Sequence, residues 1–371
     1  MKTYLFIVAA VLVLGVFMEQ RGNGNKKYII LMAALHTFVC GFRYMYLTGD
    51  LRKYAAGYYE IVKSGWLSEN VLKEGRNTGF FLLMKVFSEL TNGDFQIFLL
   101  FIAIVTEITL AILIAKYSPL PWMSYLVWNC LCFYGFGFSA IKQALAMGVL
   151  MIAMDAILQE EPRRFLVMTL LAGLIHFPAL VFLPAYWIAK RRVNYETIVL
   201  YILIGTAFYV FRGWLVQYVS SLYYEEEKFV LNSTQLGGRF LMIMAILLCG
   251  IVLKGFQEEN FSKLFNLIAV AAVLQMLAGF GNVFTRLTDY YFQFSILFIP
   301  MIFTNYTCNT KIDRNGTGAI LPFNERSLML FSVLIAIILV WFYYRYYIGV
   351  DVSYAVDDYT DFRFMWDVPR Q

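Results

Sequence analysis

The sequence predicts an all-α polytopic membrane protein, and three observations carry the prediction. Of the 371 residues, 60% are hydrophobic and only 15% are charged. Soluble domains carry about 25% charged residues, so water is a poor solvent for this chain. The mean hydropathy is +0.65. Apolar runs of roughly 17–25 residues, each long enough to cross a bilayer as a helix, recur along the chain. We therefore expect no soluble domain large enough to act alone.

Ten apolar runs are interpreted as full transmembrane helices. They cover residues 3–18, 28–42, 97–115, 122–138, 141–158, 197–215, 239–254, 264–280, 287–304 and 327–344. The first run is followed by Glu19, Gln20 and Arg21 rather than by the small residues of a signal-peptide cleavage site, so we expect it to be retained. No internal repeat or linker interrupts the series. The sequence thus predicts a single integral membrane domain over residues 1–371.

Two further apolar stretches, 79–90 and 165–189, are interpreted from the basic loops. Lys and Arg concentrate in short cytoplasmic loops. Five loops are basic, and they contain Arg21, Lys26 and Lys27; Arg163 and Arg164; Lys190, Arg191 and Arg192; Lys254 and Lys263; and Lys311, Arg314 and Arg326. All five loops share one side only if 79–90 is an interfacial helix and 165–189 a re-entrant helical hairpin. The first stretch is short and carries Lys85 and Glu89, as suits a helix lying on the membrane. The second has His176-Phe177-Pro178 at its centre, where the backbone can turn inside protein.

This topology leaves both termini outside, with three exterior segments: the loops 43–78 and 216–238 and the C-terminal tail 345–371. Positive charge is unusual on that side of a membrane, so each exterior cation needs a reason. Four of them begin or end predicted helices: Arg43, Lys142, Arg239 and Arg286. A phosphate or diphosphate at the membrane surface would satisfy this arrangement, since helix starts also favour anions. The alternative is that each cation reaches a headgroup or pairs with a carboxylate.

Other chemistries find little support in the sequence. The net charge of +5 comes from short loops that set topology, so no nucleic-acid partner is predicted. The five cysteines lack metal-ligand spacing and there are only two histidines, so no metal site is predicted. No P-loop, dinucleotide fingerprint, nucleophile elbow or zinc-protease motif is present. Glu107 and His36 lie inside apolar runs and are functional candidates by default.

Five short segments occur in an order that resembles a known family. They are Gly41-Phe42-Arg43-Tyr44 with Gly49-Asp50 and Tyr54; Gly79-Phe80 with Leu82-Leu83; Ile141-Lys142-Gln143-Ala144-Leu145-Ala146; Leu171-Ala172 with His176-Phe177-Pro178-Ala179-Leu180; and Arg286 with Tyr290-Tyr291-Phe292. Together they resemble the EpsG-like, Wzy-type polymerases of bacterial exopolysaccharide, capsule and O-antigen. Two positions depart from the family pattern: Lys142 stands where Arg is usual, and Asn77 where an acid is common.

The resemblance implies a GT-C-like fold and a membrane glycosyltransferase. Such an enzyme transfers a polyprenyl-diphosphate-linked glycan onto another lipid-linked repeat unit at the outer face of the bacterial cytoplasmic membrane. Its partners would be the polyprenyl-diphosphate-linked oligosaccharide and the lipid bilayer, with a flippase and a chain-length regulator. No cofactor is needed if Arg and Lys hold the leaving diphosphate.

On this basis we assign roles to the candidate residues. Arg43, Lys142, Arg239 and Arg286 are assigned to the diphosphate. Asp50 and His176 are assigned to activating the acceptor hydroxyl, although Asp50 also suits a plain turn residue and His176 a core histidine. The sugar-binding candidates are Tyr44, Tyr54, Tyr58, Gln143 and Tyr290.

Other functions remain open from the sequence. A polymer ligase of the same broad class would carry a larger late exterior loop than 216–238. A flippase or other transporter of the lipid-linked oligosaccharide is often built from repeats with matching broken helices, and only 165–189 looks broken. A membrane acyltransferase needs a histidine at its donor site, for which His176 is the candidate.

Overall fold

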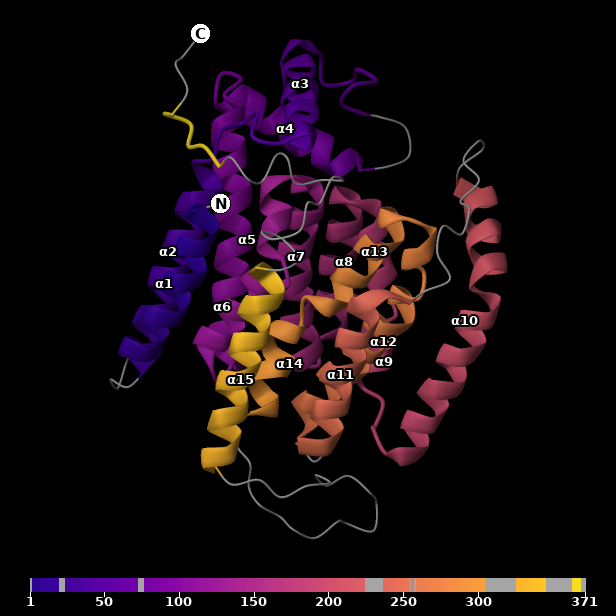
Figure 1. The fold of residues 1–371 in the computed structure, drawn as a ribbon. Helices are drawn as coiled ribbons and strands as arrows, with labels where there is room; N and C mark the ends of the chain where they lie inside the picture. Colours follow the sequence, from indigo (N-terminus) through magenta and orange to yellow (C-terminus); the bar gives the residue numbers. More distant parts are fainter. Residues whose placement is uncertain are drawn as a thin grey trace. The chain divides into compact units, whose positions relative to one another are not determined.

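The computed structural model describes residues 2–19, 24–72, 77–223, 236–253, 255–256, 258–303, 325–344 and 362–367. Regular structure in these ranges is helical, and the chain pairs as β structure at one isolated bridge, between Arg43 and Phe364. The chain divides into two compact units. The first contains Met1–Leu180 and Val333–Gln371, and the second contains Val181–Ser332. Figure 1 shows their helices coloured along the sequence.

The first unit is a bundle of apolar helices. Its members are α1 (Lys2–Glu19), α2 (Gly24–Gly41), α5 (Phe95–Tyr117), α6 (Pro121–Cys130), α7 (Ile141–Leu158) and α8 (Pro162–Ile175). The helix starts have local causes. The Asp94 carboxylate accepts hydrogen bonds from the backbone N–H groups of Gln96 and Ile97 at the start of α5. α6 and α8 each begin with proline, which suits the first helical turn because no N–H partner is needed there.

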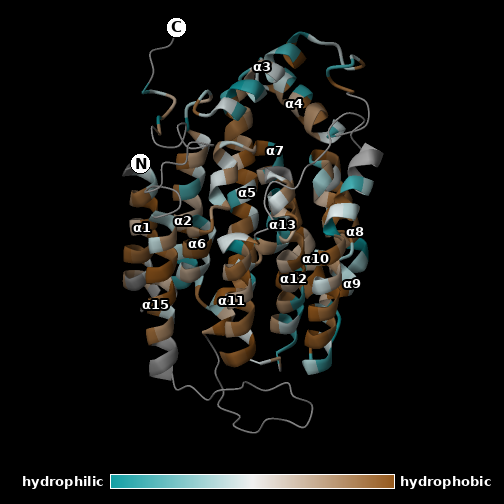
Figure 2. Ribbon diagram, turned by 45° about the vertical axis from the view of Figure 1, so that its right-hand side comes forward, coloured by the Kyte–Doolittle hydropathy of each residue, from teal (hydrophilic) through white to brown (hydrophobic). Residues whose placement is uncertain are grey.

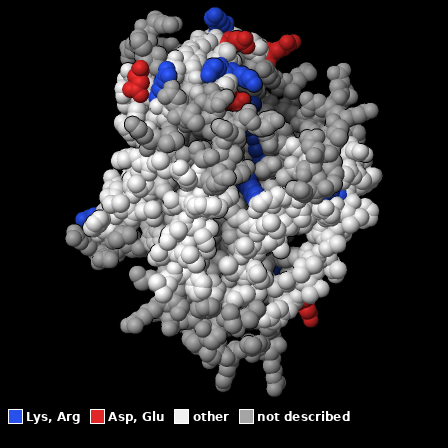
Figure 3. Space-filling model, in the orientation of Figure 1, with Lys and Arg blue, Asp and Glu red and all other residues white. Residues whose placement is uncertain are grey.

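Two further helices of the first unit, α3 (Gly49–Lys63) and α4 (Thr78–Leu90), lie beyond the ends of α5 and α7 (Figure 1). This end of the unit is called the α3–α4 end below. Figure 2 shows hydrophobic ribbon along the bundle and hydrophilic ribbon on α3. In Figure 3 most charged side chains on the face shown gather at the end where Figure 1 places α3.

The second unit contains α9 (Ala185–Ala189), α10 (Tyr195–Tyr223), α11 (Gly237–Leu253), α12 (Glu259–Gln275), α13 (Asn282–Phe292) and α14 (Ser295–Ile302). α15 (Glu325–Tyr343) begins in it and continues into the first. The side chain of Asn266 on α12 connects this helix to α10 and to the end of α9. The side-chain amide donates to the carbonyls of Ile188, Ala189 and Arg191 at 2.8–3.2 Å and accepts from the Tyr201 hydroxyl at 2.7 Å. The end of α9, whose carbonyls lack helical partners, is thereby satisfied.

Among the described residues, four helical stretches are long and apolar enough to cross a membrane by length and composition: Phe95–Tyr117, Ile141–Leu158, Tyr195–Tyr218 and Glu259–Phe280. Shorter apolar helices accompany them. The chain is therefore a helical, multi-pass membrane protein, as the sequence predicts. The count of ten spans, the GT-C-like fold and the single domain stay predictions.

Two predicted spans are divided in the structure. The run 122–138 is expected to be one helix, but α6 ends at Cys130, Cys132 has a left-handed φ of 61°, and a 3-10 helix, η1 (Tyr134–Phe138), follows. A Cβ at Gly137 would lie 2.7 Å from the Cys40 sulfur, so this turn packs closely against α2. The run 287–304 is likewise shared between α13 and α14. Of the predicted exterior segments, residues 73–76, 224–235, 345–361 and 368–371 lie outside the described residues.

The predicted break at the centre of 165–189 is present. α8 ends at Ile175, His176 is extended with φ −144° and ψ 103°, and the 3-10 helix η2 (Phe177–Phe182) follows. The stretch 79–90 is also helical, as α4. The re-entrant path of 165–189 and the interfacial placement of α4 stay predictions, because the second leg of the hairpin belongs to the other unit.

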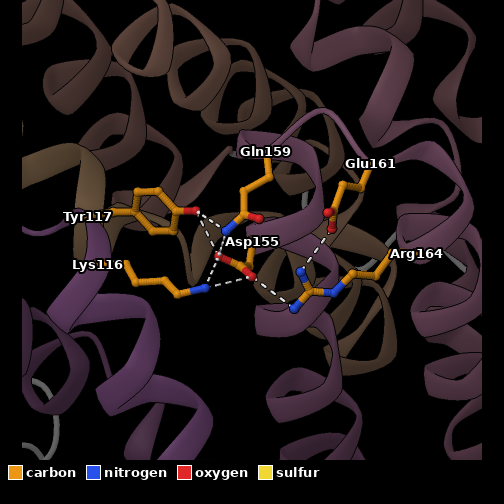
Figure 4. Close-up of polar contacts among 6 residues, drawn as sticks. All are labelled: Lys116, Tyr117, Asp155, Gln159, Glu161 and Arg164. Carbon is orange, nitrogen blue, oxygen red and sulfur yellow. Dashed lines mark hydrogen bonds and ion pairs between the residues drawn. The ribbon is translucent and has the colours of Figure 1, made fainter.

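A polar network, drawn in Figure 4, joins α5, α7 and α8. It lies at the C-terminal ends of α5 and α7, away from α3 and α4. At its centre is Asp155, whose side chain is only 6% exposed. Its carboxylate accepts from Lys116 at 2.9 Å, from the Tyr117 hydroxyl at 2.7 Å and from Arg164 at 2.9 Å. Gln159 donates to it at 3.1 Å. This buried carboxylate is fully paired, which fixes the start of α8 against the ends of α5 and α7.

Candidate active site

The backbone of Arg43, just after α2, is held from two sides. The Gln96 amide at the start of α5 donates to the carbonyls of Gly41 and Arg43 at 2.7 and 3.0 Å. On the other side residues 362–367 pair with it: the Tyr44 N–H donates to the Arg363 carbonyl, and the Met365 N–H donates to the Phe42 carbonyl, both at 2.9 Å. Arg43 therefore occupies a fixed position at the α3–α4 end.

The Arg43 guanidinium is buried with unused hydrogen-bonding capacity. The residue is 0% exposed. One terminal nitrogen donates to the Cys40 carbonyl and lies 3.3 Å from the Cys40 sulfur, and the guanidinium carbon is 5.8 Å from the Phe138 ring centroid. Within the described part of the chain, Nε and Nη2 have no hydrogen-bond partner. An unpaired buried charge is costly, so this arrangement indicates a place for an anionic ligand.

Aromatic rings of the tail segment 362–367 cover this region. Phe362 lies 5.7 Å from Tyr4 and 5.9 Å from Phe138, measured between ring centroids. Trp366 stacks on Phe364 at 4.7 Å. The tail segment thus places aromatic rings next to Arg43, and its backbone pairing with residues 42–44 fixes their position.

Lys142 opens α7 among aromatic rings from α3 and α4. Its ammonium lies 5.4 Å from the ring centroid of Tyr54, 6.0 Å from that of Phe80 and 5.6 Å from that of Phe81. A cation within about 6 Å of a ring face is attracted by the ring's quadrupole. Phe138, which Arg43 approaches, is four residues before Lys142. The structure therefore places two predicted cations at the α3–α4 end of the first unit.

His176 is half-buried at the end of α8, beside the start of α4. The backbone N–H of the next residue, Phe177, donates to the Asn77 side-chain oxygen at 2.9 Å. Gly79 contacts the last turn of α8, since a Cβ there would lie 3.0 Å from the Leu174 carbonyl oxygen. His176 is thus brought to the same helix, α4, whose phenylalanines contact Lys142.

Asp50 lies in the first turn of α3, and its side chain is 43% exposed. The Lys53 ammonium is 3.9 Å from it. The helix cap is supplied by the neighbouring Thr48, whose hydroxyl accepts from the Leu51 N–H at 3.2 Å. This setting is that of a solvated first-turn carboxylate, so the structure adds no support to the role predicted for Asp50.

The five predicted sugar-binding residues occupy different environments. Tyr54 and Tyr44 are half-buried at the α3–α4 end. Tyr58 is fully buried, stacked 5.7 Å from Phe98, and Gln143 and Tyr290 are also buried. Burial raises the pKa of the Tyr58 phenol, which keeps it neutral. Sugar contact by Tyr58, Gln143 and Tyr290 stays a prediction, and their burial favours packing.

The second unit brings the other two predicted cations together around one carboxylate. Arg239, at the start of α11, forms an ion pair with the buried Asp289 of α13, and its guanidinium lies 5.4 Å from the Phe292 ring centroid. Arg286, one turn before Asp289 and exposed, also interacts with it electrostatically. The Asp289 carboxylate therefore interacts with both predicted cations of this unit. The meeting of these cations with Arg43 and Lys142 at one diphosphate stays a prediction.

Several polar groups that the sequence did not single out are buried in the second unit. Arg212, 5% exposed within α10, donates to the Met276 carbonyl at 2.9 Å and stacks 4.0 Å from the Tyr209 ring centroid. Four buried oxygens have no hydrogen-bond partner in the described residues; they belong to Gln275, Thr288, Gln293 and Ser295. A buried group that stays unsatisfied costs about 1–3 kcal/mol, so water or a polar ligand would stabilise this part of α12–α14.

Of the two default candidates in the apolar runs, His36 is structurally accounted for. Its Nδ1 lies 2.8 Å from the Met32 carbonyl, and its Nε2 lies 2.9 Å from the Asn129 amide nitrogen. A neutral ring that donates from Nδ1 and accepts at Nε2 satisfies both contacts. Glu107 is 2% exposed, and one of its carboxylate oxygens has no partner in the described residues.

Comparison with known proteins finds one family. A model described as the EpsG family matches residues 26–359. Comparison with curated proteins and with solved structures found no significant match.

Proposed function

The chain belongs to the EpsG family, and from this we propose that it is a polysaccharide polymerase acting on lipid-linked repeat units. Family membership supports a polymerase-type function in general. The proposed reaction transfers a glycan from its polyprenyl diphosphate carrier onto a second lipid-linked repeat unit. The alternatives are a polymer ligase and a transporter of the same lipid-linked oligosaccharide.

One observation carries the proposal beyond the family: the buried Arg43 guanidinium, with two nitrogens that lack partners in the described residues. In the proposed step the acceptor hydroxyl oxygen attacks the anomeric carbon of the donor sugar. The bond from that carbon to the phosphate oxygen breaks, and its electron pair leaves with the polyprenyl diphosphate. Negative charge grows on this oxygen, so preorganised cations lower the barrier. Arginine suits phosphate because its N–H groups form a planar fork.

The structure supports a role in diphosphate binding to different degrees for the other three cations. Lys142 lies at the same end as Arg43 and supplies charge without the fork. Arg239 and Arg286 both interact with the Asp289 carboxylate in the second unit. We assign all four cations to the diphosphate.

The acceptor hydroxyl must lose its proton to a base. Between the two candidates, the setting of His176 supports it better, because it is half-buried at the break after α8 and lies next to α4. The Asp50 carboxylate faces solvent and Lys53. Among the sugar-binding candidates, Tyr54 is favoured, since its ring adjoins Lys142 and remains partly exposed.

The proposed reaction also sets the location and partners. We place it at the outer face of the bacterial cytoplasmic membrane, where the predicted topology puts Arg43 and Lys142. Lipid-linked units then have to reach that face, which is the task of a flippase. Polymer length then depends on when a growing chain is released, which is where a chain-length regulator would act.

Substitution of Lys142 tests its part in the site. Lys142→Met should lower polymer formation by about 10²-fold, because one charge that stabilises the leaving group is removed. Lys142→Arg should restore most of the activity, since arginine keeps the charge and also stacks on aromatic rings. Lys53→Met is the matched control, because its side chain is 84% exposed on the neighbouring α3. Equal activity of Lys142→Met and the control would contradict the assignment.

A deletion in the native bacterium, with surface glycan separated by size on a gel, tests the function. Single repeat units in place of a ladder of long chains would support a polymerase, because flipping and attachment still operate. Long chains that stay on their lipid carrier would indicate a ligase. Complete loss of surface glycan with lipid-linked units trapped inside would indicate a transporter.

A further inference from the structure

We propose that Asn77 is a positioning residue that holds His176 in place relative to Lys142, through the start of α4. The inference rests on the proposed function for what His176 and Lys142 do. The contact itself is independent of that function. The residues involved belong to the first unit, so their mutual placement is defined.

The first observation is the use that Asn77 makes of its side chain. Asn77 precedes α4 with φ 62° and ψ 22°, a left-handed conformation that Asn, Asp and Gly tolerate best. At this position an Asn side chain usually caps its own helix, but here it makes no such bond. Its oxygen instead accepts from the Phe177 N–H, 100 residues away, at 2.9 Å. The backbone immediately after His176 is thereby tied to the start of α4.

The second observation is that the start of α4 packs closely against the end of α8. A Cβ at Gly79 would lie 3.0 Å from both the Cβ and the carbonyl oxygen of Leu174. Contacts this short leave little room for a side chain, so only glycine lets the two backbones approach without displacement. The hydrogen bond from Phe177 and the glycine contact therefore act on the same junction.

The third observation is that the next two residues contact Lys142. Phe80 is fully buried and Phe81 partly so, and their ring centroids lie 6.0 and 5.6 Å from the Lys142 ammonium. The segment Asn77–Phe81 thus contacts the residues around the His176 break through Asn77 and Gly79, and Lys142 through Phe80 and Phe81. A shift of this segment would move base and cation relative to each other, and misplacement by about 1 Å can cost 10²-fold in rate.

Position 77 requires a left-handed backbone and a side-chain acceptor. Two variants distinguish these requirements. Asn77→Gly keeps the conformation and removes the acceptor. Asn77→Asp keeps both. Asn70→Gly is the matched control, because Asn70 is an exposed asparagine of the same loop that donates to Ser64.

The first measurement is hydrogen exchange at Phe177 in the full-length protein in detergent. We expect faster exchange in Asn77→Gly and native exchange in Asn77→Asp and Asn70→Gly. Native exchange in Asn77→Gly would overturn the contact. This readout needs no activity, so it stands apart from the proposed function.

The second measurement is polymer formation on lipid-linked repeat units, in a double-mutant cycle with His176→Ala. We expect Asn77→Gly to lower the maximal rate by about tenfold or more in the native background, with rescue by Asn77→Asp. In the His176→Ala background the same change should have little further effect, because Asn77 acts through His176. The positioning role would be overturned if Asn77→Gly lowered the rate equally in both backgrounds. It would also be overturned if the native protein polymerised and Asn77→Gly left its rate unchanged. Absence of polymer from the native protein would instead refute the proposed function.

Discussion

Replacing Arg43 by glutamine is expected to lower polymer formation by about 10²–10³-fold, the loss typical when one preorganised charge-stabilising donor is removed. The side chain is 0% exposed, and two of its nitrogens have no partner in the described residues, so its charge is available to a ligand. Glutamine is uncharged and removes the planar fork. The activity of Arg43→Lys should lie between that of the native protein and that of Arg43→Gln, because lysine keeps the charge without bidentate contact.

Two companion variants make the Arg43 result specific. Arg52→Gln is the control, since Arg52 is an exposed arginine of α3 at the same end, and it should polymerise normally. Arg286→Gln should lose activity as well if the cluster of the second unit holds the same diphosphate. Native polymer length in both Arg43→Gln and Arg286→Gln, with normal protein levels in the membrane, would contradict the assignment of the cations.

Replacing Asp155 by alanine is expected to have the largest effect on stability, lowering the free energy of unfolding by about 2–3 kcal/mol. The change removes a buried carboxylate that accepts from Lys116, Tyr117, Gln159 and Arg164. This loss lies below the cost of breaking a fully buried pair, because the side chains of Lys116 and Arg164 are 42% and 39% exposed and can regain water. The measurement is thermal unfolding in detergent.

Glu161→Gln is the matched control for Asp155→Ala. Glu161 pairs with the same Arg164 but is 47% exposed, so its loss should change stability little. Asp155 lies thirteen residues after Lys142 on α7, about 20 Å along the helix. Activity per folded molecule should therefore remain native in Asp155→Ala. An unchanged unfolding temperature would contradict the structural role of this network.

The helices themselves were largely predictable, because apolar runs and start signals are local. Pro121 and Pro162 begin α6 and α8, and Asp94 caps α5. The break at His176 was also visible, since a histidine followed by Phe-Pro interrupts an apolar run. The division of 122–138 was not, because it depends on the left-handed Cys132 and on close packing of Gly137 against Cys40. Hydropathy does not report such contacts.

The candidate site was predictable only in part. Helical spacing within α3 places Leu51, Ala55 and Tyr58 on one face, and the structure buries all three. The same spacing turns Asp50 and Lys53 outward. Helical periodicity alone therefore favours a solvated carboxylate at Asp50 and a packed ring at Tyr58. Contacts between distant segments could not be predicted from the sequence. The bridge from Arg43 to Phe364 and the bond from Phe177 to Asn77 join residues far apart in sequence, and no local pattern announces them.

The most direct test of the proposed polymerase function is a reaction of the purified protein with synthetic polyprenyl-diphosphate-linked repeat units, without other proteins or nucleotides. We predict a ladder of longer lipid-linked chains, with one polyprenyl diphosphate released for each unit added, and loss of both products in Arg43→Gln. Substrate that remains at one repeat unit, with the native protein folded and the lipid bound, would contradict this function.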